Sequence, residues 1–197
     1  MIRDYESYTL LLASQSPRRR QLLEELGLPF RVVETGHSEE IYPPELKGGE
    51  IASYLAHLKS EAYRGELADR EILLTADTVV WHLGKELGKP ANRDEAIYML
   101  SALSGSVHQV YTGVCLRSNK KEERFFACTD VGFAPLTGDE ITYYVDHYKP
   151  FDKAGAYGIQ EWIGHIGVER MEGSYFNVMG LPVQKLYSVL KSEFLNT

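Results

Sequence analysis

Short, continuous apolar runs recur along the chain and are separated by polar segments. Runs of this length are typical of buried β-strands. Two of the longer runs flank the polar segment 118–123, which predicts a β-hairpin. The predicted strands are residues 9–13, 30–33, 72–81, 107–116, 124–133 and 167–171.

Other segments carry apolar residues three or four positions apart, a spacing that predicts helices with one buried face. Ser16 and Pro17 suit the N-cap and the first turn of one such helix, and Gly27 suits its end. Thr137 suits the N-cap of another. The predicted helices are residues 17–26, 50–64, 94–103, 138–148 and 182–194.

Strands and helices that alternate in this way predict an α/β fold with a mixed sheet of parallel and antiparallel strands. The chain has 197 residues, of which 44% are hydrophobic, enough for one domain or for one domain with two lobes. No internal repeat or long linker interrupts it. We therefore expect a single domain over residues 1–197, with the loops at 34–49 and 150–159 gathered at a central cleft.

The formal net charge is −7. Nucleic-acid binding through the phosphate backbone depends on clustered Lys and Arg, so this class of protein is not expected. No apolar stretch approaches the roughly 20 residues that span a bilayer, and no signal-peptide pattern opens the chain. The prediction is a cytoplasmic protein with no membrane partner.

The chain has two cysteines, Cys115 and Cys128, and both lie in apolar, strand-like segments. Their spacing fits neither a zinc site nor a disulfide framework. Two reduced thiols in the core are predicted.

A basic turn, Ser16-Pro17-Arg18-Arg19-Arg20, interrupts this acidic background. It follows a predicted strand and opens a helix, whose first N–H groups and partial positive charge favour phosphate binding. Arginine adds bidentate hydrogen bonds to phosphate oxygens. Neighbouring helical side chains point about 100° apart, so we favour Arg18, the closest to the helix start. The alternative is a set of solvated charges on the helix surface.

Asp77 lies within the apolar run at residues 72–81. A carboxylate in an apolar strand is costly unless it is paired, hydrogen-bonded or bound to a metal. Thr78 offers a hydroxyl beside it. Metal binding or activation of water is therefore predicted for Asp77, and a structural ion pair or a turn cap is the alternative.

Other polar residues give weaker signals. Lys59 and Lys89 are candidate phosphate ligands, although each could be an ordinary surface charge. Gln160 follows a glycine-rich segment and offers both a donor and an acceptor, which suits reading the edge of a base; the glycines could equally build a tight turn. Neither GxxxxGK[ST] nor GxGxxG occurs, so P-loop and Rossmann chemistry are not indicated.

Taken together, these stretches resemble the Maf family of nucleoside triphosphate pyrophosphatases. The resemblance covers nearly the whole chain, and its motifs follow the family's order. The matching stretches are Leu-Ala-Ser-Gln-Ser-Pro-Arg-Arg at residues 12–19, Ala-Asp-Thr-Val-Val at 76–80, Leu-Gly-Lys-Pro at 87–90, Leu-Ser-Gly at 103–105 with His108 and Thr-Gly-Val at 112–114, Asp-Lys-Ala-Gly-Ala-Tyr-Gly-Ile-Gln at 152–160, and Glu-Gly-Ser-Tyr-Phe-Asn-Val-Met-Gly-Leu-Pro at 172–182.

The resemblance implies the fold shared by Maf and inosine-triphosphate pyrophosphatases, with two lobes, a mixed twisted sheet and a deep cleft. It also implies the reaction: water attacks the α-phosphorus of a nucleoside triphosphate and releases the monophosphate and pyrophosphate. A divalent cation, Mg²⁺ or Mn²⁺, would screen the phosphates. The family is further associated with homodimers and with arrest of cell division.

The resemblance also implies roles for individual residues. Asp77 matches the catalytic acid-base residue. Positions that distinguish the branch acting on dTTP and UTP are matched by Arg18, Thr78 and Gln160. Phosphate contacts are implied for Ser14, Arg18, Lys59 and Lys89. The metal would be held by Asp77 with Glu39, although the local pattern departs from the family's and leaves Glu40 as the alternative.

Two other functions remain open from sequence. The same reaction could act on a purine or a modified nucleotide. Alternatively, the protein could be a nucleotide sensor that inhibits septum formation with little turnover, although such a sensor has no need of a buried base at Asp77.

Overall fold

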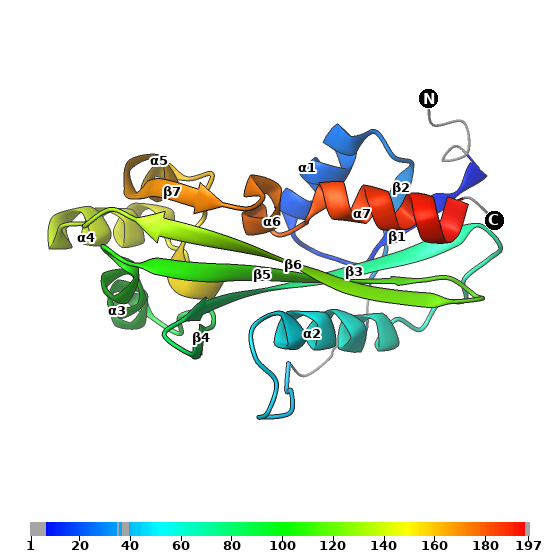
Figure 1. Cartoon of the computed structure of the whole chain (residues 1–197), viewed down its shortest axis with the longest axis horizontal. Coiled ribbons are helices and arrows are strands. Elements are labelled where there is room, and N and C mark those ends of the chain that lie inside the picture. The colour runs from blue at the N-terminus through cyan, green and yellow to red at the C-terminus, as the bar shows by residue number, and fades with distance from the viewer. Residues whose placement is uncertain (1–6, 35, 37–39, 196–197) are drawn as a thin grey trace. The chain divides into compact units, whose positions relative to one another are not determined.

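The computed structural model describes residues 7–34, 36 and 40–195. The chain divides into two compact units, whose helices and strands are labelled in Figure 1. The first is built from Met1–Asp77, Thr112–Ala127 and Gly180–Thr197, and the second from Thr78–Tyr111 and Cys128–Met179. The chain passes from one unit to the other within three of its strands, β3 (Glu71–His82), β5 (Val107–Arg117) and β6 (Glu122–Phe133).

The strands form a mixed sheet in the order β2-β1-β3-β5-β6-β7, with β4 paired to β3. β1 (Thr9–Leu12) pairs in parallel with both β2 (Phe30–Val32) and β3. β4 (Lys85–Leu87) and β7 (Val168–Glu172) pair antiparallel with β3 and β6. The predicted α/β class with a mixed sheet is confirmed.

The first unit adds α1 (Pro17–Leu26), α2 (Gly49–Glu61) and α7 (Val183–Val189), which continues into the π-helical turn η3 (Leu190–Leu195). Ser16 caps α1 by accepting the backbone N–H of Arg19, and Gly27 ends the helix with φ 72°. Both features were predicted from the sequence. The core is mainly leucine, and Leu11 and Leu73 are fully buried within it.

The second unit adds α3 (Arg93–Leu103), α4 (Gly138–Tyr148), the 3₁₀ turn η2 (Ala154–Ala156), α5 (Trp162–Gly167) and α6 (Tyr175–Met179). Thr137 and Glu140 form a reciprocal capping box at the start of α4. The predicted cap at Thr137 is therefore confirmed, and this helix ends at Tyr148 as expected.

Three short elements were not predicted. β4 follows a two-residue turn at Leu83 and Gly84, both with positive φ, and its three residues are too few to show a pattern. α5 and α6 have six and five residues, fewer than periodicity needs. No helix within the described ranges has the length and apolar character needed to cross a membrane.

Candidate functional site

The loop between β1 and α1 is shaped by the hydroxyl groups of two serines. Ser14 Oγ accepts the backbone N–H of Ser16 at 3.2 Å and Nη1 of Arg19 at 3.3 Å. Ser16 Oγ accepts the backbone N–H of Arg19 at 3.4 Å. The loop is thereby held at the N-terminus of α1, where backbone N–H groups and the helix dipole favour an anion.

The side chain of Arg19 contacts this loop. Its Nε donates to the carbonyl oxygen of Gly180 at 2.8 Å, which fixes the guanidinium from the other end of the sequence. Burial lowers the pKa of Arg19, with the charge of Arg18 acting in the same direction, while Asp77 and Glu40 raise it. These opposing effects place two carboxylates near the Arg19 charge. Sequence reasoning preferred Arg18 and passed over Arg19.

Lys59, in the last turn of α2, joins the same two carboxylates. Its Nζ forms ion pairs with Asp77 Oδ1 and, at 2.9 Å, with Glu40 Oε1. Only 22% of the Lys59 side chain and 12% of the Asp77 side chain are exposed, so this pair is screened by little water. Asp77 is thus a paired, hydrogen-bonded carboxylate at the end of the first unit's part of β3.

The residues of this cluster fit a divalent cation. Mg²⁺ and Mn²⁺ prefer carboxylate oxygens, and Asp77 and Glu40 both direct an oxygen at one ammonium group. The Lys59 ammonium group therefore lies where a positive charge balances the two carboxylates. Glu39, the residue expected at the metal, lies outside the described residues, whereas its alternative Glu40 joins the cluster.

The remaining predicted residues lie in the second unit. Gly155 donates its N–H to the carbonyl oxygen of Gly88 at 3.0 Å, which ties the glycine-rich segment to the turn that carries Lys89. Gln160 ends this segment, and its Oε1 is buried and accepts no hydrogen bond from the residues that the structure describes. Thr78, the first residue of this unit, is half-buried.

The predicted site residues thus form two sets. Ser14, Arg18, Lys59 and Asp77 belong to the first unit, and Thr78, Lys89 and Gln160 belong to the second. Within the first set, the charges of Asp77 and Arg18 both act on Arg19. The first set offers cationic and anionic groups for phosphate chemistry, and the second offers a lysine and a carboxamide.

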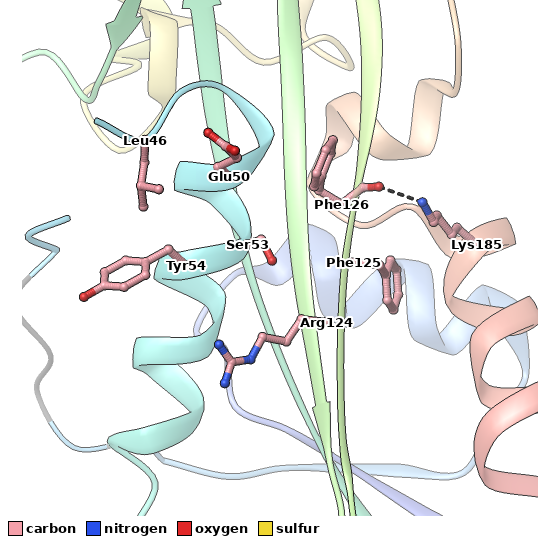
Figure 2. Close-up of a pocket in the computed structure, with 8 residues that line it drawn as sticks. All are labelled: Leu46, Glu50, Ser53, Tyr54, Arg124, Phe125, Phe126 and Lys185. Carbon is pink, nitrogen blue, oxygen red and sulfur yellow. Dashed lines mark hydrogen bonds between the residues drawn. The ribbon is translucent and has the colours of Figure 1, made fainter. Parts of the chain in front are cut away.

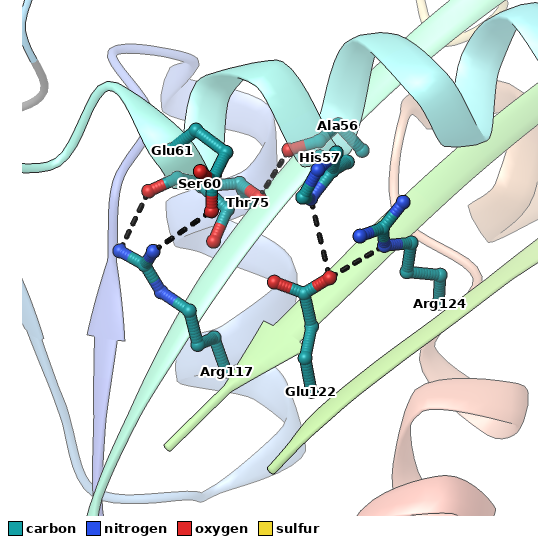
Figure 3. A network of polar contacts seen from close by, with 8 residues as sticks. All are labelled: Ala56, His57, Ser60, Glu61, Thr75, Arg117, Glu122 and Arg124. Carbon is teal, nitrogen blue, oxygen red and sulfur yellow. Dashed lines mark hydrogen bonds and ion pairs between the residues drawn. The ribbon is translucent and has the colours of Figure 1, made fainter. Parts of the chain in front are cut away.

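A separate polar network joins α2 to β5 and β6 in the first unit (Figure 3). His57 Nδ1 lies 3.2 Å from Glu122 Oε1, and Arg124 donates to the same oxygen. His57, Glu122 and Cys115 form a group of ligand atoms that lie within 4.8 Å of one another. The guanidinium of Arg124 already neutralises the carboxylate, and burial raises the pKa of the Cys115 thiol to about 12. We interpret the network as a structural ion pair.

Both cysteines are free thiols, as predicted. The prediction that both lie in the core is right for Cys115 and wrong for Cys128, which is exposed. β6 alternates along this stretch, with Arg124, Phe126 and Cys128 facing solvent. The strand therefore has one solvated face, which its apolar composition concealed.

A surface groove of about 470 Å³ lies between α2, β6 and α7 (Figure 2). Its rings come from Tyr54, Phe125 and Phe126. Lys185 donates to the carbonyl oxygen of Phe126 at 2.9 Å, so its ammonium already has a partner in the groove. None of the predicted site residues lines this groove.

Comparisons with known proteins show what the whole chain is similar to. A family model described as "Maf-like protein" matches residues 9–193. A Bacteroides fragilis protein named dTTP/UTP pyrophosphatase is 54% identical over 191 residues, covering 97% of this chain and 99% of the relative. A Flavobacterium johnsoniae protein of the same name is 49% identical, covering 94% and 95%. A solved HAM1 protein from Coxiella burnetii has a TM-score of 0.52 at 17% identity, covering 93% of this chain and 98% of that one, and so shares the fold.

Proposed function

We propose, on the premise that the chain belongs to the Maf family, that it hydrolyses dTTP and UTP to the nucleoside monophosphate and pyrophosphate. The observation that carries the proposal is the Asp77 carboxylate, buried in β3 and held by Lys59 beside the charge of Arg19. An acid so placed has cations around it that suit a triphosphate, which carries about four negative charges.

The phosphates bind to the first unit's cations. Arg19 presents a fixed guanidinium, and the β1–α1 loop presents the Ser14 hydroxyl and the N-terminus of α1. Lys59 completes this set when its ammonium turns from the carboxylates to a phosphate oxygen. Lys89 and Arg18 are assigned to further phosphate contacts. Positioning and charge stabilisation of this kind supply most of the catalysis in phosphoryl transfer.

Water attacks the α-phosphorus, so that a new P–O bond forms as the bond between the α-phosphorus and the bridging oxygen breaks. The bridging oxygen leaves with pyrophosphate. Asp77 accepts the proton of the attacking water if it acts as general base. As a metal ligand it would instead hold the cation, and both roles suit a carboxylate that is paired with the Lys59 ammonium group.

Asp77 and Glu40 are the residues that would hold Mg²⁺ or Mn²⁺. When bound, the ion would screen the phosphate charge and lower the pKa of a coordinated water. Glu39, which lies outside the described residues, remains the other candidate.

The base is read by Gln160, with Arg18 and Thr78 as the other specificity residues. A carboxamide accepts from N3–H and donates to O4 of uracil or thymine, and cytosine presents the opposite pattern. The buried Gln160 Oε1, which accepts no hydrogen bond within the described part of the chain, supports this role.

The test is a turnover panel of nucleoside triphosphates with Mg²⁺ and separate detection of pyrophosphate and orthophosphate. We expect dTTP and UTP to give pyrophosphate. Faster hydrolysis of a purine or modified nucleotide would keep the reaction but change the assigned substrate. Tight binding without turnover would favour a nucleotide-sensing protein. Orthophosphate alone would refute the reaction.

The substitution Asp77→Asn tests whether the Asp77 carboxylate takes part in catalysis. It should lower kcat by several orders of magnitude, because the variant neither accepts a proton nor balances a cation. Asp69→Asn is the matched control, since Asp69 is 79% exposed, lies 4.0 Å from Lys120 Nζ and accepts one surface hydrogen bond from Asn119. Near-normal turnover by Asp77→Asn would remove Asp77 from the mechanism.

A further inference from the structure

A polar triad that includes Glu161, the residue after Gln160, lies in the second unit. Glu161 Oε1 forms an ion pair with Lys153 Nζ at 3.2 Å, and Glu161 Oε2 accepts a hydrogen bond from the hydroxyl group of Tyr144. Tyr144 is fully buried, and only 9% of the Lys153 side chain is exposed. None of these three residues has a role in the reaction proposed above.

The Tyr144 hydroxyl group also binds the backbone of the segment that leads to Gln160. Its oxygen accepts the N–H of Gly158 at 3.1 Å while its hydrogen is donated to Glu161. Burial raises the pKa of Tyr144, and the hydrogen bond to Glu161 raises it further, so the phenol remains a donor. One hydroxyl group of α4 therefore fixes both the start and the end of residues 158–161.

The backbone around Gln160 is closely packed. A Cβ on Gly158 would lie 2.9 Å from Glu161 Cδ and 3.0 Å from Gln160 Nε2, so the carboxamide packs on bare backbone. A Cβ on Gly164 would lie 1.9 Å from the carbonyl oxygen of Ile159, which brings α5 equally close. Backbone therefore packs closely on both sides of Gln160, and the nitrogen of its carboxamide lies against Gly158.

The packing around Gln160 affects which base its carboxamide can bind. Rotation of a carboxamide by 180° exchanges its oxygen and nitrogen and converts a pattern that fits uracil into one that fits cytosine. An amide that turns freely therefore discriminates poorly between the two bases. Discrimination requires surroundings that hold one orientation.

We propose that Tyr144, Glu161 and Lys153 are positioning residues that hold Gln160 in the orientation that accepts uracil or thymine and rejects cytosine. The proposal rests on the function proposed above. These residues contact the Gln160 segment and need not touch the substrate.

The experiment compares kcat/KM for UTP and for CTP in the wild-type protein and in the Tyr144→Phe variant. The variant loses the hydrogen that is donated to Glu161 and the oxygen that accepts from Gly158. We expect the ratio of UTP to CTP to fall at least tenfold, mainly through a higher KM for UTP and a lower KM for CTP. Tyr143→Phe is the matched control, because Tyr143 is 45% exposed and stacks on His147.

The ratio is measured on folded protein and does not respond to a loss of stability, because both substrates meet the same enzyme. If Tyr144→Phe does not fold, Lys153→Met removes the ion pair to Glu161 and must lower the ratio in the same direction. An unchanged ratio in a folded variant overturns the positioning role. Failure of the wild type to hydrolyse UTP is a different result, which overturns the proposed function itself.

Discussion

His108 should make the protein sensitive to mild acid. It lies on β5, 1% exposed, and its Nε2 is 2.7 Å from the hydroxyl oxygen of Tyr157. The rings of Phe133 and Tyr157 meet it edge-on at 5.2 and 5.4 Å. Burial lowers the pKa of His108 to about 3, with the charge of His82 contributing in the same direction.

The sign and size of the effect follow from linkage. Because the pKa is lower in the folded state than the roughly 6.5 of an unfolded histidine, protonation favours unfolding. The stability that neutral His108 contributes is fully present above a pH of about 6.5 and is lost as the pH falls below that value. At pH 5, 1.5 units below it, the loss amounts to about 2 kcal/mol, at about 1.4 kcal/mol per unit.

The assay is urea unfolding at pH 7.5 and pH 5 for the wild type and for His108→Gln. Glutamine keeps a hydrogen-bonding group for Tyr157 but does not titrate. The wild type should lose about 2 kcal/mol more than the variant between the two pH values. His165→Gln, at an exposed position, should follow the wild type. Equal pH dependence of the wild type and His108→Gln would refute the reasoning.

Two further substitutions test the first unit. Arg19→Lys should raise KM for dTTP about tenfold in the turnover panel, because an ammonium cannot bind bidentately as a guanidinium does, whereas the exposed Arg20→Lys should change it little. Gly113→Ala should lower the free energy of unfolding by about 1–3 kcal/mol or more in urea, because its Cβ would lie 2.2 Å from the backbone of Ala52. Gly138→Ala, which meets nothing within 4 Å, is the control, and equal stabilities would contradict the expected clash.

The main elements could be predicted because their signals are local. The predicted strand at 9–13 and the helix that follows it match β1 and α1, since an apolar run and the caps Ser16 and Gly27 lie within a few residues. β4 could not be predicted, because it depends on pairing with Val80 and its neighbours rather than on its own composition. The prediction of one domain around a central cleft stays a prediction.

The candidate site likewise depends on contacts between residues that are far apart in the sequence. The sequence marks Asp77 as an unusual acid, but the identity of its cation depends on α2, which brings Lys59 to it from 18 positions earlier. The contacts of Arg19 depend on the rotation of α1 and on the Gly180 carbonyl oxygen, 161 positions away, and the prediction for Arg18 stays a prediction. Spacing within the arginine turn contains no information about that contact.

On the function proposed above, the arrangement of charges in the first unit suits a triphosphate, although the chain has a net charge of −7. Arg19 and Lys59 are balanced by Asp77 and Glu40, so the cluster is nearly neutral and the cost of burying its cations is offset. A triphosphate adds about four negative charges to this balance. If Lys59 turns to the phosphates, Asp77 and Glu40 lose their counter-ion, and two carboxylates beside a polyanion need another cation. Asp77 and Glu40 would hold a divalent ion, which would supply that positive charge, and this is the physical reason to expect metal dependence at this site.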